Sequence, residues 1–168
     1  MLDKNVVRHH LQGLVRLERG TALRAVETMA LIFVHEAQRQ GKRVFISPAS
    51  FHILRLVSRY REVQVFLRSV EVLYPARYHK RWARRLREMG FTREDAVILS
   101  LGTFGTDAEQ TLLGVHAIAT FDQPLITKYT LDQADIQIRL EAMTANLAPP
   151  FDHAILPQVG RPLDLLCF

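Results

Sequence analysis

Apolar residues recur at helical spacing over most of the chain, and short apolar runs separate the helical segments. The spacing predicts six helices, over residues 5–17, 22–40, 49–73, 76–89, 93–104 and 131–143. The third segment, residues 49–73, is expected to form either one helix or two. Short apolar runs predict strands at residues 43–46, 115–119 and 153–156.

Polar side chains at the ends of these segments predict where the helices begin. Thr21 is expected to cap the second helix and Thr92 the fifth. The fifth helix also carries Glu94 in its first turn, where the helix dipole favours acids. Thr130 with Gln133 resembles a capping box for the last helix.

The order of these elements predicts the class of fold. Helices alternate with short strands that are apolar on both faces, which is typical of a parallel sheet covered by helices on each side. We therefore expect an α/β fold, a three-layer sandwich with a central parallel sheet flanked by helices. No repeat and no linker divides the sequence, so residues 1–168 are expected to form a single domain.

Composition indicates the class of protein and its expected cellular location. The chain has 168 residues, of which 48% are hydrophobic and 23% charged, as in ordinary globular proteins. No apolar run approaches the roughly 20 residues of a membrane span, and the first residues lack the apolar core of a secretory signal. Cys167 is the only cysteine, which excludes an internal disulfide and a cysteine-based zinc site. A cytoplasmic location without membrane attachment is expected.

Three aspartates follow or flank apolar segments where they could converge. Asp3 ends the opening Met1-Leu2, Asp122 follows the strand at 115–119, and Asp95 lies in the first turn of a helix. A cluster of carboxylates suits Mg²⁺ or Mn²⁺, because hard cations prefer oxygen ligands. Asp95 and Asp122 are also well placed to act only as helix caps, and that alternative stays open.

Five short segments, in order along the chain, also resemble the motifs of a known family. Residues 2–6 look like the opening motif of PIN domains, in which an aspartate closes the first strand and Asn-Val follows. Residues 45–48 resemble the second strand of that family, and residues 94–99 resemble its Asp-Ala helix start. Residues 117–122 look like its Val-Thr-x-Asp strand end, and residues 153–157 resemble its closing strand.

The resemblance implies a PIN-like nuclease, a hydrolase that binds magnesium or manganese and cleaves RNA. It places the catalytic, metal-binding acids at Asp3, Asp95 and Asp122, with Asn5 and Thr120 supporting them through hydrogen bonds. Glu94 is a further carboxylate beside this site. The resemblance implies RNA as the substrate, and an antitoxin, another protein or a second copy of the chain as partners.

The sequence departs from the family pattern after the second strand. The family usually places a glutamate in the helix that follows, whereas residues 49–54 contain no acid and His52 is the nearest polar candidate. A neutral imidazole can bind Mn²⁺, but it cannot match the charge of a carboxylate toward Mg²⁺. The first strand is also short, since only two residues precede Asp3.

The helix expected at residues 76–89 concentrates the positive charge of a chain whose net charge is +5. Its apolar stripe is narrow, and we expect Trp82 to lie in the core. Basic side chains that could contact phosphates cover the rest: Arg77, Lys80, Arg81, Arg84, Arg85 and Arg87. A solvated face without a partner is the alternative.

Three functions therefore compete. The first is a PIN-like, metal-dependent endoribonuclease that hydrolyses phosphodiester bonds of single-stranded RNA, either as the toxin of a toxin–antitoxin pair or in RNA processing. The second is a catalytically weakened PIN-like module that binds RNA or a partner protein, for which the missing glutamate is the evidence. The third is an unrelated α/β domain in which the aspartates are only helix caps.

Overall fold

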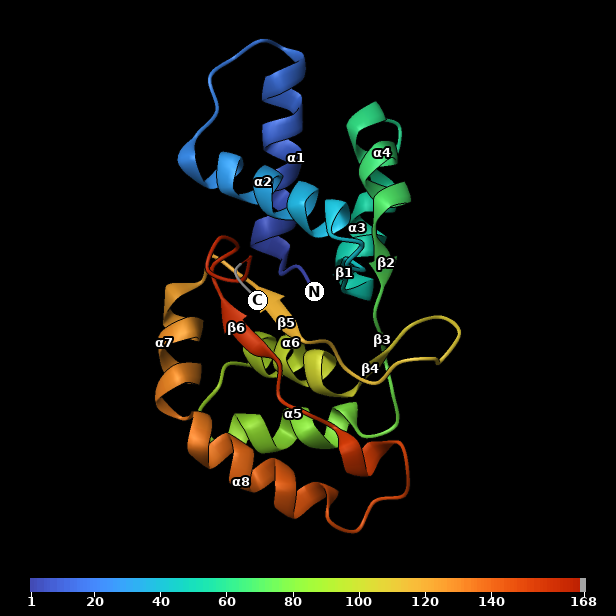
Figure 1. The fold of residues 1–168 in the computed structure, drawn as a ribbon, viewed down its shortest axis with the longest axis vertical. Coiled ribbons are helices and arrows are strands. Elements are labelled where there is room, and N and C mark those ends of the chain that lie inside the picture. The colour runs from blue at the N-terminus through green and yellow to red at the C-terminus, as the bar shows by residue number, and fades with distance from the viewer. Residues whose placement is uncertain (167–168) are drawn as a thin grey trace. The chain divides into compact units, whose positions relative to one another are not determined.

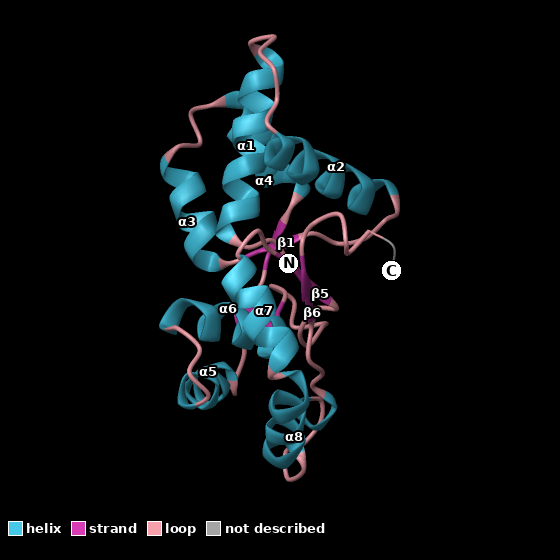
Figure 2. Cartoon of the chain, turned by 90° about the vertical axis from the view of Figure 1, so that its left-hand side faces the viewer, coloured by secondary structure: helices cyan, strands magenta, loops and turns pink. Residues whose placement is uncertain are grey.

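The structure, a computed structural model, describes residues 1–166, so Cys167 lies outside the described residues. It mixes helices with short strands in small sheets, a content compatible with an α/β protein (Figure 2). The chain divides into two compact units. The first comprises Met1–Val72, Ala119–Phe121 and the residues from Gly160 onward, and the second comprises Leu73–Ile118 and Asp122–Val159.

Four helices and two strands make up most of the first unit (Figure 1). They are α1 (Lys4–Glu18), α2 (Ala25–Arg39), β1 (Phe45–Ile46), α3 (Pro48–Leu56), α4 (Arg61–Ser69) and β2 (Glu71–Val72). Helix α1 packs against α2 and α4, and α3 packs against α4. Apolar side chains on the facing sides of these helices, such as Val6 and Phe66, are buried. Burial of these apolar sides is the main favourable term in folding of the unit.

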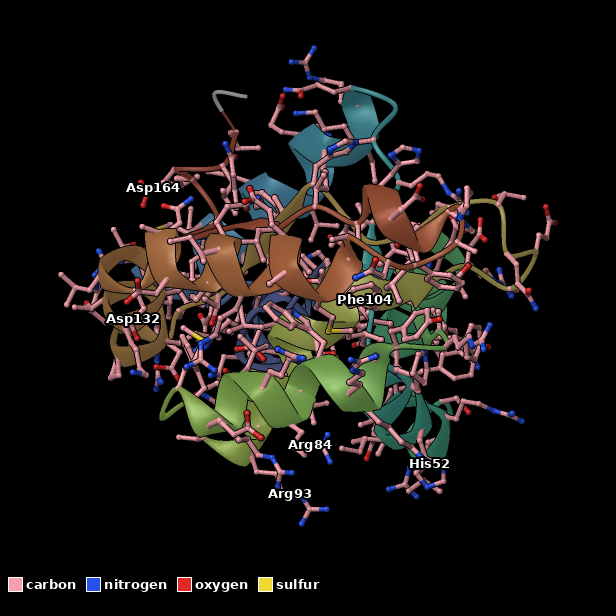
Figure 3. All side chains as sticks on the ribbon, turned by 90° about the horizontal axis from the view of Figure 1, so that it is seen from below. His52, Arg84, Arg93, Phe104, Asp132 and Asp164 are labelled. Carbon is pink, nitrogen blue, oxygen red and sulfur yellow. The ribbon has the colours of Figure 1, made fainter. Side chains whose placement is uncertain are left out.

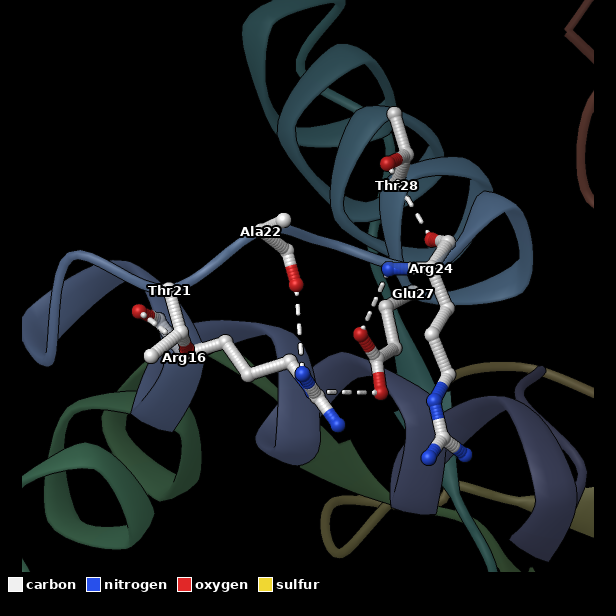
Figure 4. Close-up of polar contacts among 6 residues, drawn as sticks. All are labelled: Arg16, Thr21, Ala22, Arg24, Glu27 and Thr28. Carbon is white, nitrogen blue, oxygen red and sulfur yellow. Dashed lines mark hydrogen bonds and ion pairs between the residues drawn. The ribbon is translucent and has the colours of Figure 1, made fainter.

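A buried carboxylate fixes the turn between α1 and α2 (Figure 4). Glu27 is 1% exposed; its Oε1 accepts from Arg16 Nε at 3.1 Å and its Oε2 from the Arg24 backbone N–H at 2.8 Å. Arg16 also donates to the carbonyl of Ala22. The expectation that Thr21 caps this helix is wrong, because its hydroxyl donates back to the Arg16 carbonyl and α2 begins only after Arg24.

The strands of the first unit pair in parallel. β1 pairs with β2, and Leu2 pairs with Ile46 on one side and with Ala119 on the other. The Leu2 N–H donates to the carbonyl of Phe45 at 2.7 Å, and the Asp3 N–H donates to the carbonyl of Ala119 at 3.0 Å. A single residue, Leu2, therefore takes the place of a first strand directly before Asp3.

The second unit contains four helices, and two further strands contribute residues to both units. Its elements are β3 (Tyr74–Pro75), α5 (His79–Glu88), α6 (Arg93–Phe104), β4 (Gly105–Thr106), α7 (Gln123–Leu131), α8 (Gln133–Thr144) and the 3₁₀ helix η1 (Phe151–His153). β3 and β4 pair antiparallel. The shared strands, β5 (Ala117–Ala119) and β6 (Gln158–Gly160), pair with each other.

Helices α5 and α6 enclose the core of the second unit. Trp82 and Phe104 are both fully buried, with their ring centroids 6.5 Å apart, so the prediction that Trp82 lies in the core is confirmed. Thr92 caps α6 as predicted, by accepting from the backbone N–H of Asp95. The predicted helix over residues 93–104 is confirmed at both ends.

Several expected elements differ from the structure. The helix expected over 49–73 is two helices, α3 and α4, and it stops at Ser69, after which β2 pairs with β1. The capping box at Thr130 is wrong, because the Thr130 hydroxyl donates to a carbonyl within α7, a helix that the sequence analysis missed. The strand expected at 153–156 is absent from the described residues; η1 ends at His153 and the pairing strand β6 follows at Gln158.

None of the helices within residues 1–166 combines the length and the apolar character that crossing a membrane requires. The expectation that one domain spans residues 1–168 stays a prediction.

Candidate metal centre and nucleic-acid interface

Asp3 is the most firmly positioned of the predicted acids. Its side chain is largely buried in the first unit, where Oδ2 accepts from the Thr120 hydroxyl at 2.8 Å. Oδ1 accepts from the Lys4 backbone N–H at 2.6 Å, which makes Asp3 the cap of α1. The amide nitrogen of Asn5 lies 3.5 Å from Oδ2. The carboxylate is therefore held in one orientation by donors from two distant parts of the sequence.

Thr120 is the residue that ties these parts together. It follows the end of β5, is fully buried, and donates its backbone N–H to the carbonyl of Gly160 at 3.0 Å. Ala119 pairs in parallel with Leu2, so the next residue of each segment, Thr120 and Asp3, lies at the same end of the pair. The Thr120 hydroxyl therefore lies beside the Asp3 carboxylate. The structure thus brings Asp3, Asn5 and Thr120 together in the first unit.

Asp122 and Asp95 belong to the second unit, and both contact the first turn of a helix. Asp122 is the N-cap of α7, since its Oδ1 accepts from the Leu125 N–H at 3.1 Å. Asp95 is the third residue of α6, and its Oδ2 accepts from the hydroxyl of Thr92 at 2.6 Å. Each of these contacts satisfies polar groups at a helix terminus, as expected if the aspartates act as caps.

The two remaining predicted site residues are exposed. Glu94 lies in the first turn of α6, and His52 lies on α3 (Figure 3). Across residues 1–166, no three or more His, Cys, Asp or Glu side chains form a group that could hold a metal ion. The three aspartates have the right donor chemistry for a hard cation, but they do not form such a group in the described residues.

Helix α5 presents the basic surface that the sequence predicted. Trp82, Ala83 and Leu86 are buried on one side of the helix, and its other side is basic. Five of the basic residues are exposed and Arg85 is half-buried; the exposed ones are Arg77, Lys80, Arg81, Arg84 and Arg87. Arg84 extends away from the helix (Figure 3), 3.9 Å from Glu88. The buried side fixes the helix, so the cations form an ordered surface.

Two histidines without a predicted role lie away from the solvent: His10 is buried and His79 is half-buried. His10 packs against Phe66 with ring centroids 4.9 Å apart, and burial lowers its pKa to about 4 against a hydrogen bond to Ala30 that raises it. Burial likewise lowers the pKa of His79. A signal was present for His10, because it lies four residues after the core residue Val6 on the same side of α1.

Comparison with known proteins yields no relative: no family model, curated protein or solved structure matches the chain. The assignment of function therefore depends on the residues and their geometry.

Proposed function

We propose that the chain is a metal-dependent endoribonuclease of PIN-like type, which hydrolyses phosphodiester bonds of single-stranded RNA. One observation carries the proposal. Asp3 and Thr120 each directly follow one of two chain segments that pair in parallel, and their side chains form a hydrogen bond with each other. In α/β proteins, ligands bind beyond the carboxyl ends of parallel strands. A carboxylate held there by a buried hydroxyl matches what the PIN-like resemblance implies for both residues.

The proposal includes the finer fold, a central parallel sheet flanked by helices. The pairings that support it run from β2 to β1, from β1 to Leu2 and from Leu2 to Ala119 of β5. β6 then pairs with β5. In the proposed sheet, the chain segments before Asp3 and Asp122 would occupy neighbouring positions.

Asp3, Asp95 and Asp122 would hold Mg²⁺ or Mn²⁺, whose chemistry is to lower the pKa of a bound water and to stabilise the leaving oxygen. Chain connectivity favours Asp3 and Asp122 among these acids. Asp122 is only two residues beyond Thr120, the hydrogen-bond partner of Asp3, so the α-carbons of Thr120 and Asp122 lie within about 7 Å of each other. Since the described residues contain no ready-made group for a metal ion, the acids must come together when the ion binds. We therefore expect weak metal affinity.

Other residues of the chain would orient the carboxylate of Asp3 and bind the RNA strand. Thr120 and Asn5 orient the carboxylate of Asp3 through contacts with its Oδ2. The cations of α5 would hold the phosphates of a single strand, as basic grooves do in other proteins that bind single strands. The proposal places cleavage at the aspartates and strand binding on α5.

Cleavage of a labelled single-stranded RNA tests the proposal. We expect cutting with Mn²⁺ or Mg²⁺, none with EDTA, and a loss of at least about 100-fold in Asp3→Asn and Asp122→Asn. Asparagine keeps the capping acceptor, so both variants should fold. Asp132→Asn is the matched control, because Asp132 also directly precedes a helix, α8, but belongs to no predicted site. Cutting that persists in EDTA, or in both site variants, would contradict the proposal.

Thr120→Val separates positioning from ligation. It removes the hydroxyl that donates to Asp3 and keeps the shape of the side chain, so we expect Mn²⁺ affinity to fall about 10- to 100-fold. Titration of Mn²⁺ followed by its paramagnetic effect on the water signal measures this directly. An unchanged affinity would show that Asp3 does not bind the ion.

The second candidate is a PIN-like module that binds RNA or a partner protein without cleaving it. Two observations favour it: the lack of a group able to hold a metal ion in the described residues, and the exposure of His52 where the family usually has a glutamate. Salt-sensitive RNA binding that is unchanged by EDTA, together with no cutting in any metal, would select this function.

A further inference from the structure

The residues that end α3 expose an apolar stripe. Ile53, Leu56, Val57 and Tyr60 are 61%, 72%, 37% and 50% exposed. Ile53 and Leu56 lie three residues apart on one side of α3, and Val57 and Tyr60 lie in the turn that follows the helix. Apolar residues scattered singly on a surface are ordinary, whereas four of them within eight positions mark an interaction site.

The stripe is not a displaced part of the core. Leu54, between the exposed residues, is 4% exposed and anchors α3 in the first unit, and Val63 and Phe66 anchor the neighbouring α4. The inner sides of both helices are thus already packed. The outer stripe adds nothing to the stability of the isolated chain, because its side chains stay in water.

Arginines lie in and near the segment that carries the stripe, and one of them, Arg59, contacts Tyr60. Arg55, Arg59 and Arg68 are exposed, and none of them forms an ion pair within the part of the chain that the structure describes. The Arg59 guanidinium lies 5.0 Å from the centre of the Tyr60 ring and donates to its hydroxyl at 3.0 Å. Glu62 is the one nearby acid on α4, and it is engaged with Glu18 and Arg61. The rim of the stripe is therefore positively charged.

We propose that this stripe binds a partner protein through an amphipathic helix with an apolar face and acidic flanks. Anchors spaced by three, four and seven residues suit a helix that packs along them. The arginine rim requires acids on the partner, since complementary charge fixes register and like charge is repelled. The inference does not depend on the nuclease proposal.

Other occupants fit less well. A second copy of the chain in a two-fold interface would bring the same patch of each copy together, and with it two sets of arginines. RNA would pair its phosphates with the arginines but would leave Ile53 and Leu56 without apolar contacts. Only a partner that is apolar in the centre and acidic at the edge satisfies both features.

Fluorescence anisotropy with a labelled helical peptide tests the inference on the whole chain. The probe is an acidic peptide of about 18 residues with leucines at helical spacing, and its control is a scrambled peptide of the same composition. We expect binding in the micromolar range, and an affinity at least about tenfold lower for the scrambled peptide. The doubly substituted variant Ile53→Ser with Leu56→Ser should also bind at least about tenfold more weakly.

The matched control is Leu131→Ser with Ile138→Ser, which removes two side chains of similar exposure, 78% and 62%, from the second unit. It should bind the acidic peptide as the unsubstituted chain does. Equal binding of the scrambled peptide, equal loss in both double variants, or no binding at about 100 μM peptide overturns the inference. A dimer that sedimentation detects and that Leu56→Ser dissociates, or displacement of the peptide by RNA, also overturns it.

Discussion

Helix α5 and the segment from α3 through α4 both carry several arginines, but they differ in where their apolar side chains lie. On α5, the apolar stripe is buried and Trp82 and Leu86 are fully inaccessible. On α3 and its continuing turn, only Leu54 is buried among the large aliphatic residues, and Ile53 and Leu56 are exposed. Arginine thus accompanies a filled core in one segment and an uncovered apolar stripe in the other.

The difference indicates which kind of partner each helix suits. Arginines above a packed stripe offer only charge and hydrogen bonds, which is what a phosphate backbone requires. Arginines beside an uncovered stripe combine charge with apolar area, which is typical of the anchors in protein interfaces. Charge alone therefore does not distinguish the two surfaces, whereas the burial of the apolar residues does.

Truncating one apolar residue of each helix gives the largest expected contrast. Trp82→Ala should lower the free energy of unfolding by about 3–5 kcal/mol, because it leaves a cavity between α5 and α6. Leu56→Ala should change it by no more than about 0.5 kcal/mol, because the side chain is already in water. Urea denaturation followed by circular dichroism measures both, and similar costs for the two variants would show that the stripe is covered.

Acid should weaken the packing of α1 against α4 in the first unit. His10 packs against Phe66 of α4, and burial lowers its pKa to about 4 from an ordinary value near 6.5. Below about pH 6.5 the unfolded chain gains a proton that the folded chain does not, so stability present above that pH is lost as the pH falls toward 4. The loss from this residue is about 3 kcal/mol.

Urea denaturation at about pH 7 and about pH 4.5 checks this effect in two variants. His10→Leu removes the titrating group and should make the stability less dependent on pH. His35→Leu is the control, since His35 is exposed, and it should keep the pH dependence of the unsubstituted chain. If both variants keep that dependence, His10 does not carry the acid sensitivity. Burial also lowers the pKa of His79 on α5, so the second unit should weaken in the same direction.

Local signals in the sequence predicted what neighbouring residues determine. The bounds of α6 were predicted correctly because Thr92 accepts a hydrogen bond within its own first turn. Helix α7 was missed although its start carries two signals, the cap Asp122 and a proline two residues later. The aspartates were predicted both as caps and as ligands, and the capping contacts of Asp122 are those that the structure describes.

Nonlocal features were beyond the reach of a single sequence. The bond between Thr120 and Asp3 joins residues 117 positions apart, and only the resemblance to a family suggested it. Ile53 and Leu56 have the spacing of a core stripe, which is the same whether the stripe is buried in its own chain or left for a partner. Periodicity predicts that a helix has an apolar side, but not what covers that side.

RNA binding gives the smallest but most specific contrast between the two basic surfaces. Replacing two arginines of α5, as Arg81→Gln with Arg84→Gln, should weaken single-stranded RNA binding about tenfold if both contact phosphates. Each lost phosphate contact should also lower the dependence of log affinity on log salt by about 0.7. The double variant with Arg55→Gln on α3 and Arg59→Gln in the turn after it removes the same charge and should leave that slope unchanged, because those arginines belong to the segment that carries the apolar stripe. Anisotropy at several salt concentrations measures both variants. A slope that falls equally in both would mean that RNA binding follows net charge, and the distinction between a phosphate-binding helix and a protein-binding helix would be lost.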